Sequence, residues 1–204
     1  MKGTVRAARR GMSTDERRRE IVNTAAVLFD QEGYTNASMD ELAQAVGIAK
    51  ATLYHYFSSK DEILGEIHEE FIDLLIARHQ QRLGAAALRE DQLLLEAMAD
   101  ILELMETHRG HVRVFFEHHR ELPVGAREAI LAKRDLYEGM VESLIADGVK
   151  AGIFREADVH LASLATFGMC NWAYQWYRPG GRMRPREIAY HFWGLLVQGL
   201  ERRP

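Results

Sequence analysis

The stretch that decides the fold lies near the N-terminus and reads Gly47-Ile48-Ala49-Lys50-Ala51-Thr52-Leu53-Tyr54-His55-Tyr56-Phe57. Leu53 and Phe57 are four residues apart, so in a helix they lie on one face and can pack against a core. Gly47 can adopt the positive φ that lets a second helix cross the one before it. The stretch therefore predicts a short helix joined by a tight turn to a preceding helix.

Capping boxes mark helix starts on both sides of this stretch. In such a box a serine and a glutamate each satisfy a backbone N–H that the first helical turn leaves unpaired. The boxes are Ser13 with Glu16, Ser38 with Glu41, and Ser59 with Glu62. Apolar residues at helical spacing follow each box. We therefore predict a helix before the turn region, two short helices over residues 38–57, and a longer helix that begins at Ser59.

The outward face of the second short helix is rich in hydrogen-bond donors and cations. No acidic residue occurs between Ile48 and Lys60, whereas an ordinary solvated helix face usually mixes both signs of charge. A helix–turn–helix of this kind can place its second helix in the ~12 Å major groove of DNA. The pattern therefore predicts a DNA-reading helix, although the same arrangement also occurs as plain packing in all-α proteins.

Length and composition indicate a globular, helical chain. The 204 residues suit one domain, or one large and one small domain. Hydrophobic residues make up 47% and charged residues 27%, which excludes disordered and low-complexity classes. Four prolines and thinly spread glycines favour helices, and no strand-like alternation competes. The fold class is therefore predicted to be all-α.

The charge is distributed unevenly along the chain. The net charge is −4, yet residues 1–60 hold nine Lys/Arg against seven Asp/Glu, whereas the remainder holds 17 against 23. Basic residues gather in the first twenty positions. This asymmetry predicts a polyanion-binding end on an acidic body, with a solvated basic tail as the alternative.

The single cysteine, Cys170, excludes a disulfide framework and a cysteine-based zinc site, and it fits a reducing cytoplasm. The basic N-terminus lacks the apolar stretch of a signal peptide. No long uninterrupted apolar run occurs, so a transmembrane helix is not expected. We expect a cytoplasmic protein.

Three segments together resemble a known family: 29–34, 38–43 and 47–62. They closely resemble the N-terminal domain of the TetR family of transcriptional regulators, over roughly residues 17–64 without gaps. The core Thr-Leu-Tyr-x-Tyr-Phe-x-Ser-Lys, which begins at Thr52, is specific. Ala49 departs from the family pattern, because members often carry a serine N-cap there, and losing such a cap costs ~1 kcal/mol.

The resemblance implies DNA-binding roles for seven residues. The positions that face the major groove or its phosphates are Lys50, Thr52, Tyr54 and His55. The positions that hold the DNA backbone are Tyr56 and Lys60. Ser38 lies at a helix N-terminus, where a backbone amide can meet a phosphate.

Two alternatives stay open for this region. Tyr54 and Tyr56 can instead pack within the small domain. Arg6, Arg9 and Arg10 can form an arm that reaches the minor groove, or a solvated tail.

The rest of the chain is predicted to form a helical body. Residues 1–60 would form the basic arm and helix-turn-helix domain, and residues 61–204 an effector-binding and dimerisation domain. Helical patterns run near 61–83, 91–108, 111–121, 124–151, 158–178 and 185–202.

The last two of these helices are expected to form a homodimer interface. No charged residue occurs from Leu161 to Tyr177, and apolar residues surround both helices. A helix that is apolar on every face must be covered on every face. A symmetric four-helix interface would provide that cover, and it would let two reading helices span half-sites ~34–36 Å apart.

The segment 171–181 resembles the C-terminal domains of TetR-type regulators that sense coenzyme A thioesters in fatty-acid and steroid-ring breakdown. Tryptophans would provide an apolar wall, amides a few hydrogen bonds, and arginines a grip on phosphates. The alternative is that the tryptophans form dimer core and the arginines are solvated. The predicted effector-binding residues are Arg109, Arg113, Phe116, Met169, Asn171, Trp172, Gln175, Trp176 and Arg178.

Enzymatic and metal-binding patterns are mostly absent. We find no nucleophile elbow, no phosphate-binding glycine loop and no His-Glu-x-x-His. The pairs His108/His111 and His118/His119 lack carboxylates at a matching spacing, so no metal and no cofactor is predicted. We expect a repressor that a small molecule releases from a palindromic operator. The alternative is an all-helical small-molecule-binding protein or enzyme with an incidental basic end.

Overall fold

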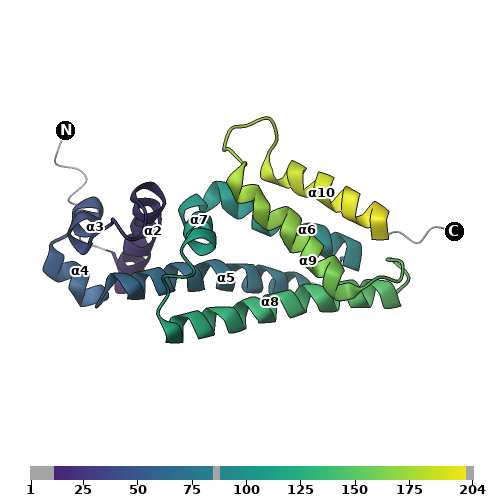
Figure 1. Cartoon of the computed structure of the whole chain (residues 1–204), viewed down its shortest axis with the longest axis horizontal. Helices are drawn as coiled ribbons and strands as arrows, with labels where there is room; N and C mark the ends of the chain where they lie inside the picture. The colour runs from purple at the N-terminus through teal and green to yellow at the C-terminus, as the bar shows by residue number, and fades with distance from the viewer. Residues whose placement is uncertain (1–11, 85–87, 201–204) are drawn as a thin grey trace.

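The computed structural model describes residues 12–84 and 88–200, with side chains up to residue 198. Every regular element in these ranges is helical, so the predicted all-α fold is confirmed (Figure 1). In chain order the elements are α2 (Thr14–Glu32), α3 (Met39–Val46), α4 (Lys50–Tyr56), α5 (Lys60–Gly84), α6 (Glu90–Thr107), α7 (Arg109–Glu117), α8 (Val124–Lys150), α9 (Val159–Asn171), the 3-10 helix η2 (Trp172–Gln175) and α10 (Pro185–Leu200).

The first three of these helices pack around the start of α5 and form a small head. Both predicted boxes at Ser13 and Ser38 are made, with each serine oxygen accepting from the backbone N–H three residues later. Gly47 ends α3 with φ of 73°, in the left-handed region, as the tight turn requires. Leu53 and Phe57 are buried, so the predicted inward face of the second short helix is confirmed.

The third predicted capping box forms only in part. The Glu62 N–H donates to Ser59 Oγ at 3.2 Å, but the Glu62 carboxylate accepts from the backbone N–H of Ser58 at 2.7 Å. The helix itself begins at Lys60 and runs from the head into the body. Buried residues of α5 belong to one core cluster that extends through both parts of the chain.

The body is elongated, and α5 and α8 run along its length beneath α6 and α9 (Figure 1). α6 is the central helix, because it packs against α5, α7, α8, α9 and α10. The head lies at one end of the body, and α7 is the body helix that packs against α2 of the head. α7 corresponds to the helix predicted over residues 111–121, but it begins two residues earlier, at Arg109, and ends at Glu117.

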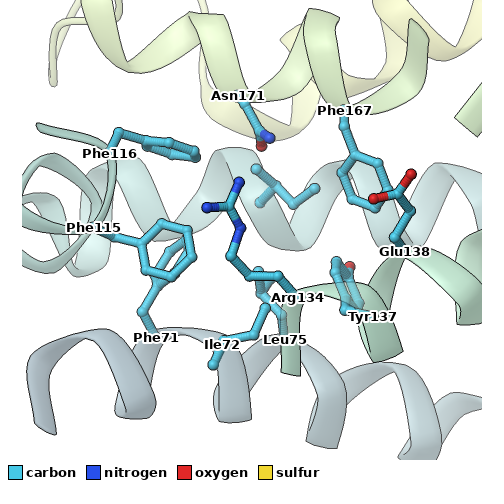
Figure 2. Close-up of a pocket in the computed structure, with 11 residues that line it drawn as sticks. Phe71, Ile72, Leu75, Phe115, Phe116, Arg134, Tyr137, Glu138, Phe167 and Asn171 are labelled. Atoms are coloured by element: carbon cyan, nitrogen blue, oxygen red, sulfur yellow. The ribbon is translucent and has the colours of Figure 1, made fainter. Parts of the chain in front are cut away.

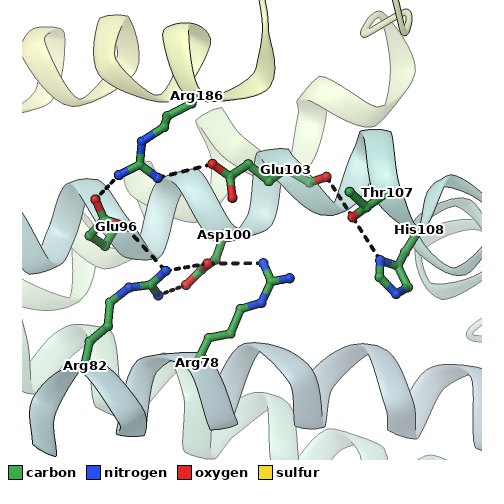
Figure 3. Close-up of polar contacts among 8 residues, drawn as sticks. All are labelled: Arg78, Arg82, Glu96, Asp100, Glu103, Thr107, His108 and Arg186. Atoms are coloured by element: carbon green, nitrogen blue, oxygen red, sulfur yellow. Dashed lines mark hydrogen bonds and ion pairs between the residues drawn. The ribbon is translucent and has the colours of Figure 1, made fainter. Parts of the chain in front are cut away.

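A charge network around the buried Asp100 connects three body helices (Figure 3). The Asp100 side chain on α6 is 1% exposed and pairs with Arg78 and Arg82 of α5. Arg186 of α10 pairs with Glu96 and Glu103 of α6. A buried carboxylate is tolerated when cations and hydrogen bonds compensate it, so this network fixes the register between α5, α6 and α10.

The helix predicted over residues 158–178 is interrupted. α9 ends at Asn171 and the chain tightens into the 3-10 helix η2, after which the Trp176 N–H donates to the Ala173 carbonyl at 3.2 Å. The aromatic residues that follow Asn171 have weaker helix propensity than Leu or Ala, and Pro179 disfavours a helical residue before it. The prediction of one continuous helix was therefore wrong.

Candidate functional site

The outer face of α4 is free of packing contacts over most of its length. Lys50, Thr52 and His55 are exposed, and Tyr54 is 45% exposed, so Tyr54 is not a core residue. Tyr56 is half-buried and packs against the core, with its ring 5.5 Å from that of His55. The helix thus presents a polar, hydrogen-bonding ridge at the end of the molecule, away from the body (Figure 1).

Lys50 is the cation of this ridge, and it is already paired. Its ammonium lies 2.8 Å from a carboxylate oxygen of Asp40, on the first turn of α3, and both side chains are exposed. This hydrogen bond raises the pKa of Lys50. A DNA phosphate that approached Lys50 would therefore compete with Asp40.

The N-terminal ends of the two short helices differ. Ala49 makes no side-chain capping bond at the start of α4, as the departure from the family pattern predicted. Ser38 caps α3, and its hydroxyl also donates to the Glu41 carboxylate at 2.8 Å. The Ser38 hydroxyl is thus engaged within the helix start.

The position of Lys60 does not match the phosphate contact expected for it. Its ammonium donates to the backbone carbonyls of Tyr34, Thr35 and Ala37, with the Ala37 oxygen at 2.7 Å, and lies 4.3 Å from the centroid of the Tyr34 ring. An ammonium has three donors. Lys60 therefore closes the loop between α2 and α3, which is a structural role.

Arg18 is a residue that the sequence reasoning did not single out. Its guanidinium donates to the Tyr56 carbonyl at 2.7 Å and to Glu66 at 2.8 Å, and lies 4.0 Å from the centroid of the Phe57 ring. It therefore fixes the end of α4 against α5. Arg17 also pairs within the chain, with Glu20, so neither arginine belongs to a free basic end. The predicted arm of Arg6, Arg9 and Arg10 lies outside the described residues.

A second feature is a partly open cavity between the body helices (Figure 2). Its interior volume is about 70 Å³, and it opens to solvent on one side. Seven of its eleven lining residues have hydrocarbon side chains, and the other four carry polar groups, so the lining offers both apolar contacts and hydrogen bonds. The lining residues are Phe71, Ile72 and Leu75 of α5, Ile101 of α6, Phe115 and Phe116 of α7, Arg134, Tyr137 and Glu138 of α8, and Phe167 and Asn171 of α9.

Helix α7 is shared between this cavity and the head. Phe115 and Phe116 line the cavity, and Phe116 also stacks on Tyr174 with ring centroids 5.0 Å apart. Where α7 meets α2, a Cβ added to Gly110 would lie 2.8 Å from the backbone carbonyl of Ala26. Arg113 of the same helix pairs with Asp30 of α2. A change in the cavity wall can thus reach the head through one short helix.

Two further hollows lie at the last helices. One, with about 820 Å³ of empty space, is lined by residues of the 176–183 segment and α10, among them Trp176, Arg178, Arg182 and Phe192. The other is lined by residues of α9 and α10, among them Met169 and Leu195.

Comparison with known proteins places the chain in a family. The family model described as "Tetracyclin repressor-like, C-terminal domain" matches residues 88–200, more than half of the chain, and the model described as "Bacterial regulatory proteins, tetR family" matches residues 21–67. The chain belongs to the TetR family of transcriptional regulators.

Individual TetR relatives match over nearly the whole chain. The HTH-type transcriptional repressor KstR2 of Rhodococcus jostii is 29% identical over 191 residues, which cover 90% of this chain and 91% of the relative. The crystal structure of the TetR family regulator PfmR from Thermus thermophilus is 36% identical, with a TM-score of 0.82, covering 89% of this chain and 99% of that one. AibR, solved in complex with isovaleryl coenzyme A and operator DNA, is 28% identical, with a TM-score of 0.79, covering 89% and 98%.

The structure distributes the predicted effector-binding residues over several places. Phe116 and Asn171 line the partly open cavity, Trp176 and Arg178 line the hollow beside α10, and Met169 lines the hollow between α9 and α10. These predicted residues are thus divided among three separate hollows.

The remaining predicted effector residues line none of these cavities. Arg113 pairs with Asp30 and Glu117 instead of facing a ligand. Arg109 and Gln175 are exposed, and Trp172 is 64% exposed.

Sequence reasoning missed the polar residues of the cavity on α8. Arg134 and Glu138 are one turn apart, and Tyr137 lies between them, within an apolar stripe that includes Ile130 and Val141. The only sequence feature that indicated these cavity residues was an arginine and a tyrosine beside an apolar helical stripe. Any amphipathic helix has such a stripe, so the sequence alone did not distinguish a cavity wall from ordinary packing.

Other titratable groups fit structural roles. In the described part of the chain, one group of side chains has metal-ligand spacing, with Glu138, Glu142 and His160 within 4.8 Å of one another. The hydrogen bond to Glu142 raises the pKa of His160, which favours a protonated, ion-paired imidazole over a metal ligand. Burial raises the pKa of the Cys170 thiol to about 12, so its predicted role as a small core residue is confirmed. None of the described helices is long and apolar enough to span a membrane.

Proposed function

We propose that this TetR-family protein is a transcriptional repressor that binds a palindromic operator as a homodimer and leaves it when a coenzyme A thioester binds. The observation that carries the proposal is the double role of α7. The same helix supplies Phe115 and Phe116 to the cavity and packs through Gly110 and Arg113 on the reading head. The relatives named above are regulators of transcription. We therefore propose that this protein acts without enzymatic activity or cofactor, and that it is located in the cytoplasm.

The DNA contacts are assigned to α4 and the start of α3. Lys50, Thr52, Tyr54 and His55 are exposed on the ridge of α4 and can meet base edges or phosphates. Backbone N–H groups at the uncapped start of α4, after Ala49, are available to phosphates. Tyr56 and the N-terminus of α3 at Ser38 are further phosphate contacts, whereas Lys60 acts by holding the loop behind them.

The dimer is assigned to α9, η2 and α10. Large apolar side chains are exposed on these elements in the single chain, with Leu161 60%, Trp172 64% and Leu195 67% exposed. Concentrated apolar exposure of this kind is typical of an interaction surface. A two-fold axis there would set two heads at the half-site spacing that helix-turn-helix dimers need.

The effector class is inferred from the cavity together with the relatives. AibR, which is 28% identical to this chain, was solved with isovaleryl coenzyme A. The partly open cavity, walled by Phe71 and its neighbours, suits an acyl group. The hollow with Arg178 and Arg182 offers guanidinium groups for the phosphates of coenzyme A.

Release requires that the effector prefer one arrangement of the two heads. A ligand with equal affinity for both arrangements shifts nothing, however tightly it binds. An acyl group that displaces Phe116 would move α7, and α7 would carry α2 with it. We propose that residues 1–60 form the DNA-reading part of the chain and residues 61–204 the effector-sensing part. Helix α5 runs from one part into the other.

The test is operator release measured by fluorescence anisotropy. The DNA probe is a labelled fragment from upstream of the gene, with bulk competitor DNA as the control for specificity. Fatty-acyl, aromatic-acyl and steroid-derived coenzyme A thioesters are titrated beside the matching free acids. We expect thioesters to release the fragment and free acids to be weaker. A protein that prefers no promoter fragment over competitor, or that no thioester releases, would contradict the proposal.

A further inference from the structure

The partly open cavity has a polar end that the protein leaves unsatisfied (Figure 2). Tyr137 is 3% exposed, and its hydroxyl has no hydrogen-bond partner among the described residues. Buried hydroxyl groups in proteins are almost always hydrogen-bonded, because an unpaired one is costly. Tyr137 lines the cavity, so a ligand oxygen that reached its buried hydroxyl would supply the missing partner.

Two further donors face the same space. Arg134, one turn before Tyr137 on α8, has no hydrogen bond or ion pair with the residues that the structure describes, and its guanidinium carbon lies 5.5 Å from the centroid of the Phe115 ring. Figure 2 shows the guanidinium directed into the cavity below the Asn171 amide, which descends from α9. Arg134 is exposed overall, so it lies where the cavity meets solvent.

The charge around this end favours an acceptor. Glu138, the acidic residue of the lining, lies 3.7 Å from His160, whose pKa is raised by its hydrogen bond to Glu142. The Glu138 charge is therefore partly compensated from outside the cavity. Burial keeps Tyr137 neutral by raising its pKa, so its hydroxyl is available as a donor at physiological pH.

We propose that the acyl group of the effector carries a second oxygen acceptor, a keto or carboxylate oxygen remote from the thioester, which Tyr137, Arg134 and Asn171 bind. The hydrocarbon between this oxygen and the thioester would pack against the aromatic wall formed by Phe71, Phe115, Phe116 and Phe167. This inference rests on the proposed effector class and narrows it. A guanidinium binds a carboxylate in a bidentate way, so Arg134 favours the carboxylate over the ketone.

Three thioesters of equal chain length test the inference: hexanoyl-, 5-oxohexanoyl- and adipyl-coenzyme A. Dissociation constants are measured by titration calorimetry on the full chain without DNA. We expect both oxygenated compounds to bind about tenfold more tightly than hexanoyl-coenzyme A. Tyr137→Phe should remove most of that difference for 5-oxohexanoyl-coenzyme A and part of it for adipyl-coenzyme A, while leaving hexanoyl-coenzyme A within about twofold. Arg134→Met should weaken adipyl-coenzyme A selectively.

Ser143→Ala is the matched control, because it removes an exposed hydroxyl on α8, outside the cavity lining. It should change none of the three constants, and thermal melting verifies that all variants fold. Equal affinity of the three thioesters would overturn the inference and leave the effector class standing. The same holds if Tyr137→Phe weakens hexanoyl-coenzyme A as much as the others, since Tyr137 would then bind the thioester carbonyl.

Free adipate, 5-oxohexanoate and hexanoate separate the inference from the proposed function. If no thioester binds but the two oxygenated acids bind in a Tyr137-dependent manner, the thioester class is wrong and the polar end is supported. If no compound of either set binds, both proposals fail.

Discussion

Arg113 on α7 and Asp30 on α2 form an ion pair that joins the sensing body to the reading head. Both side chains are partly buried, and Arg113 also pairs with Glu117, which holds its guanidinium in place. The same helix lines the effector cavity with Phe115 and Phe116. The pair therefore lies on a contact route between the cavity and α2.

We predict that Asp30→Asn weakens the coupling between effector and operator. Without effector, operator affinity should stay within about threefold of the unmodified protein, because Asp30 lies outside the polar ridge of α4. The concentration of effector needed for release should rise several-fold, since a partly buried pair of this kind contributes about 1 kcal/mol. Anisotropy titrations with and without effector measure both quantities. Arg113→Gln should add little to Asp30→Asn, and full additivity in the double mutant would argue against the pair as the coupling contact.

Gly110→Ala should separate α7 from α2. The added Cβ would lie 2.8 Å from the Ala26 carbonyl carbon and oxygen, a distance at which the backbone must shift. Overpacking of this kind costs about 1–3 kcal/mol, which corresponds to a fall in Tm of several degrees. Gly139→Ala on α8 is the matched control, because nothing lies within 4 Å of its added Cβ. It should leave Tm unchanged or raise it slightly, as helical Gly→Ala changes do. Equal Tm values for the two variants would refute the close contact between Gly110 and Ala26.

Asp40→Asn should tighten operator binding. The change removes a negative charge from the reading face and frees Lys50 from its exposed partner. We expect a several-fold gain at low salt that shrinks as salt rises, because exposed charges are screened. Lys50→Met should weaken binding and flatten the dependence of log affinity on log salt by about one unit. The measurement is anisotropy over a salt series from about 50 to about 300 mM, which is wide enough to define the slope. No change in either variant would place Lys50 away from the DNA.

Leu195→Asp should split the dimer without unfolding the subunit. Leu195 is 67% exposed in the single chain, so an aspartate there meets water unless a partner covers it. Sedimentation should show a monomer, and operator affinity should fall with it. Leu136→Asp is the control, since Leu136 is 52% exposed on α8 and lines a hollow shared with α5 and α6. Trp193 is less suited to this test, because its indole N–H donates to the Asp91 carbonyl at 2.6 Å within the subunit. Two dimeric variants would contradict the assigned interface.

His68 should make the protein less stable in mild acid. It is fully buried, and burial lowers its pKa from 6.5 to about 4, with weaker contributions from nearby His118, His119 and Arg134. Below pH 6.5 the unfolded chain binds a proton that the folded chain does not, so stability falls as the pH drops toward 4. The loss from this group between pH 7 and pH 5 should be about 2 kcal/mol. Urea unfolding at both pH values measures it, and His68→Gln should show a correspondingly smaller loss. An unchanged pH dependence in that variant would exclude His68 as the cause.

The head could be predicted from sequence because local rules determine it. The capping boxes at Ser13 and Ser38, the left-handed Gly47 and the four-residue spacing of Leu53 and Phe57 each involve residues close in the chain. Their agreement, together with the specific motif from Thr52 onward, indicated both the all-α class and the family. The exposed ridge of α4 followed directly, since helical periodicity leaves those positions outside.

The roles of individual polar side chains were decided only by the tertiary structure. Lys60, which the family resemblance assigned to DNA, reaches the carbonyls of Tyr34 and Ala37, and Arg18 reaches Glu66, so both cations are engaged within the protein. The cavity is likewise assembled from five helices, and its polar end on α8 has no local pattern of its own. Hydrogen bonds and ion pairs act over a few ångströms in space between residues far apart in the chain. Local periodicity therefore specified the helices, and only their packing specified which charges and hydroxyl groups remain available to a ligand.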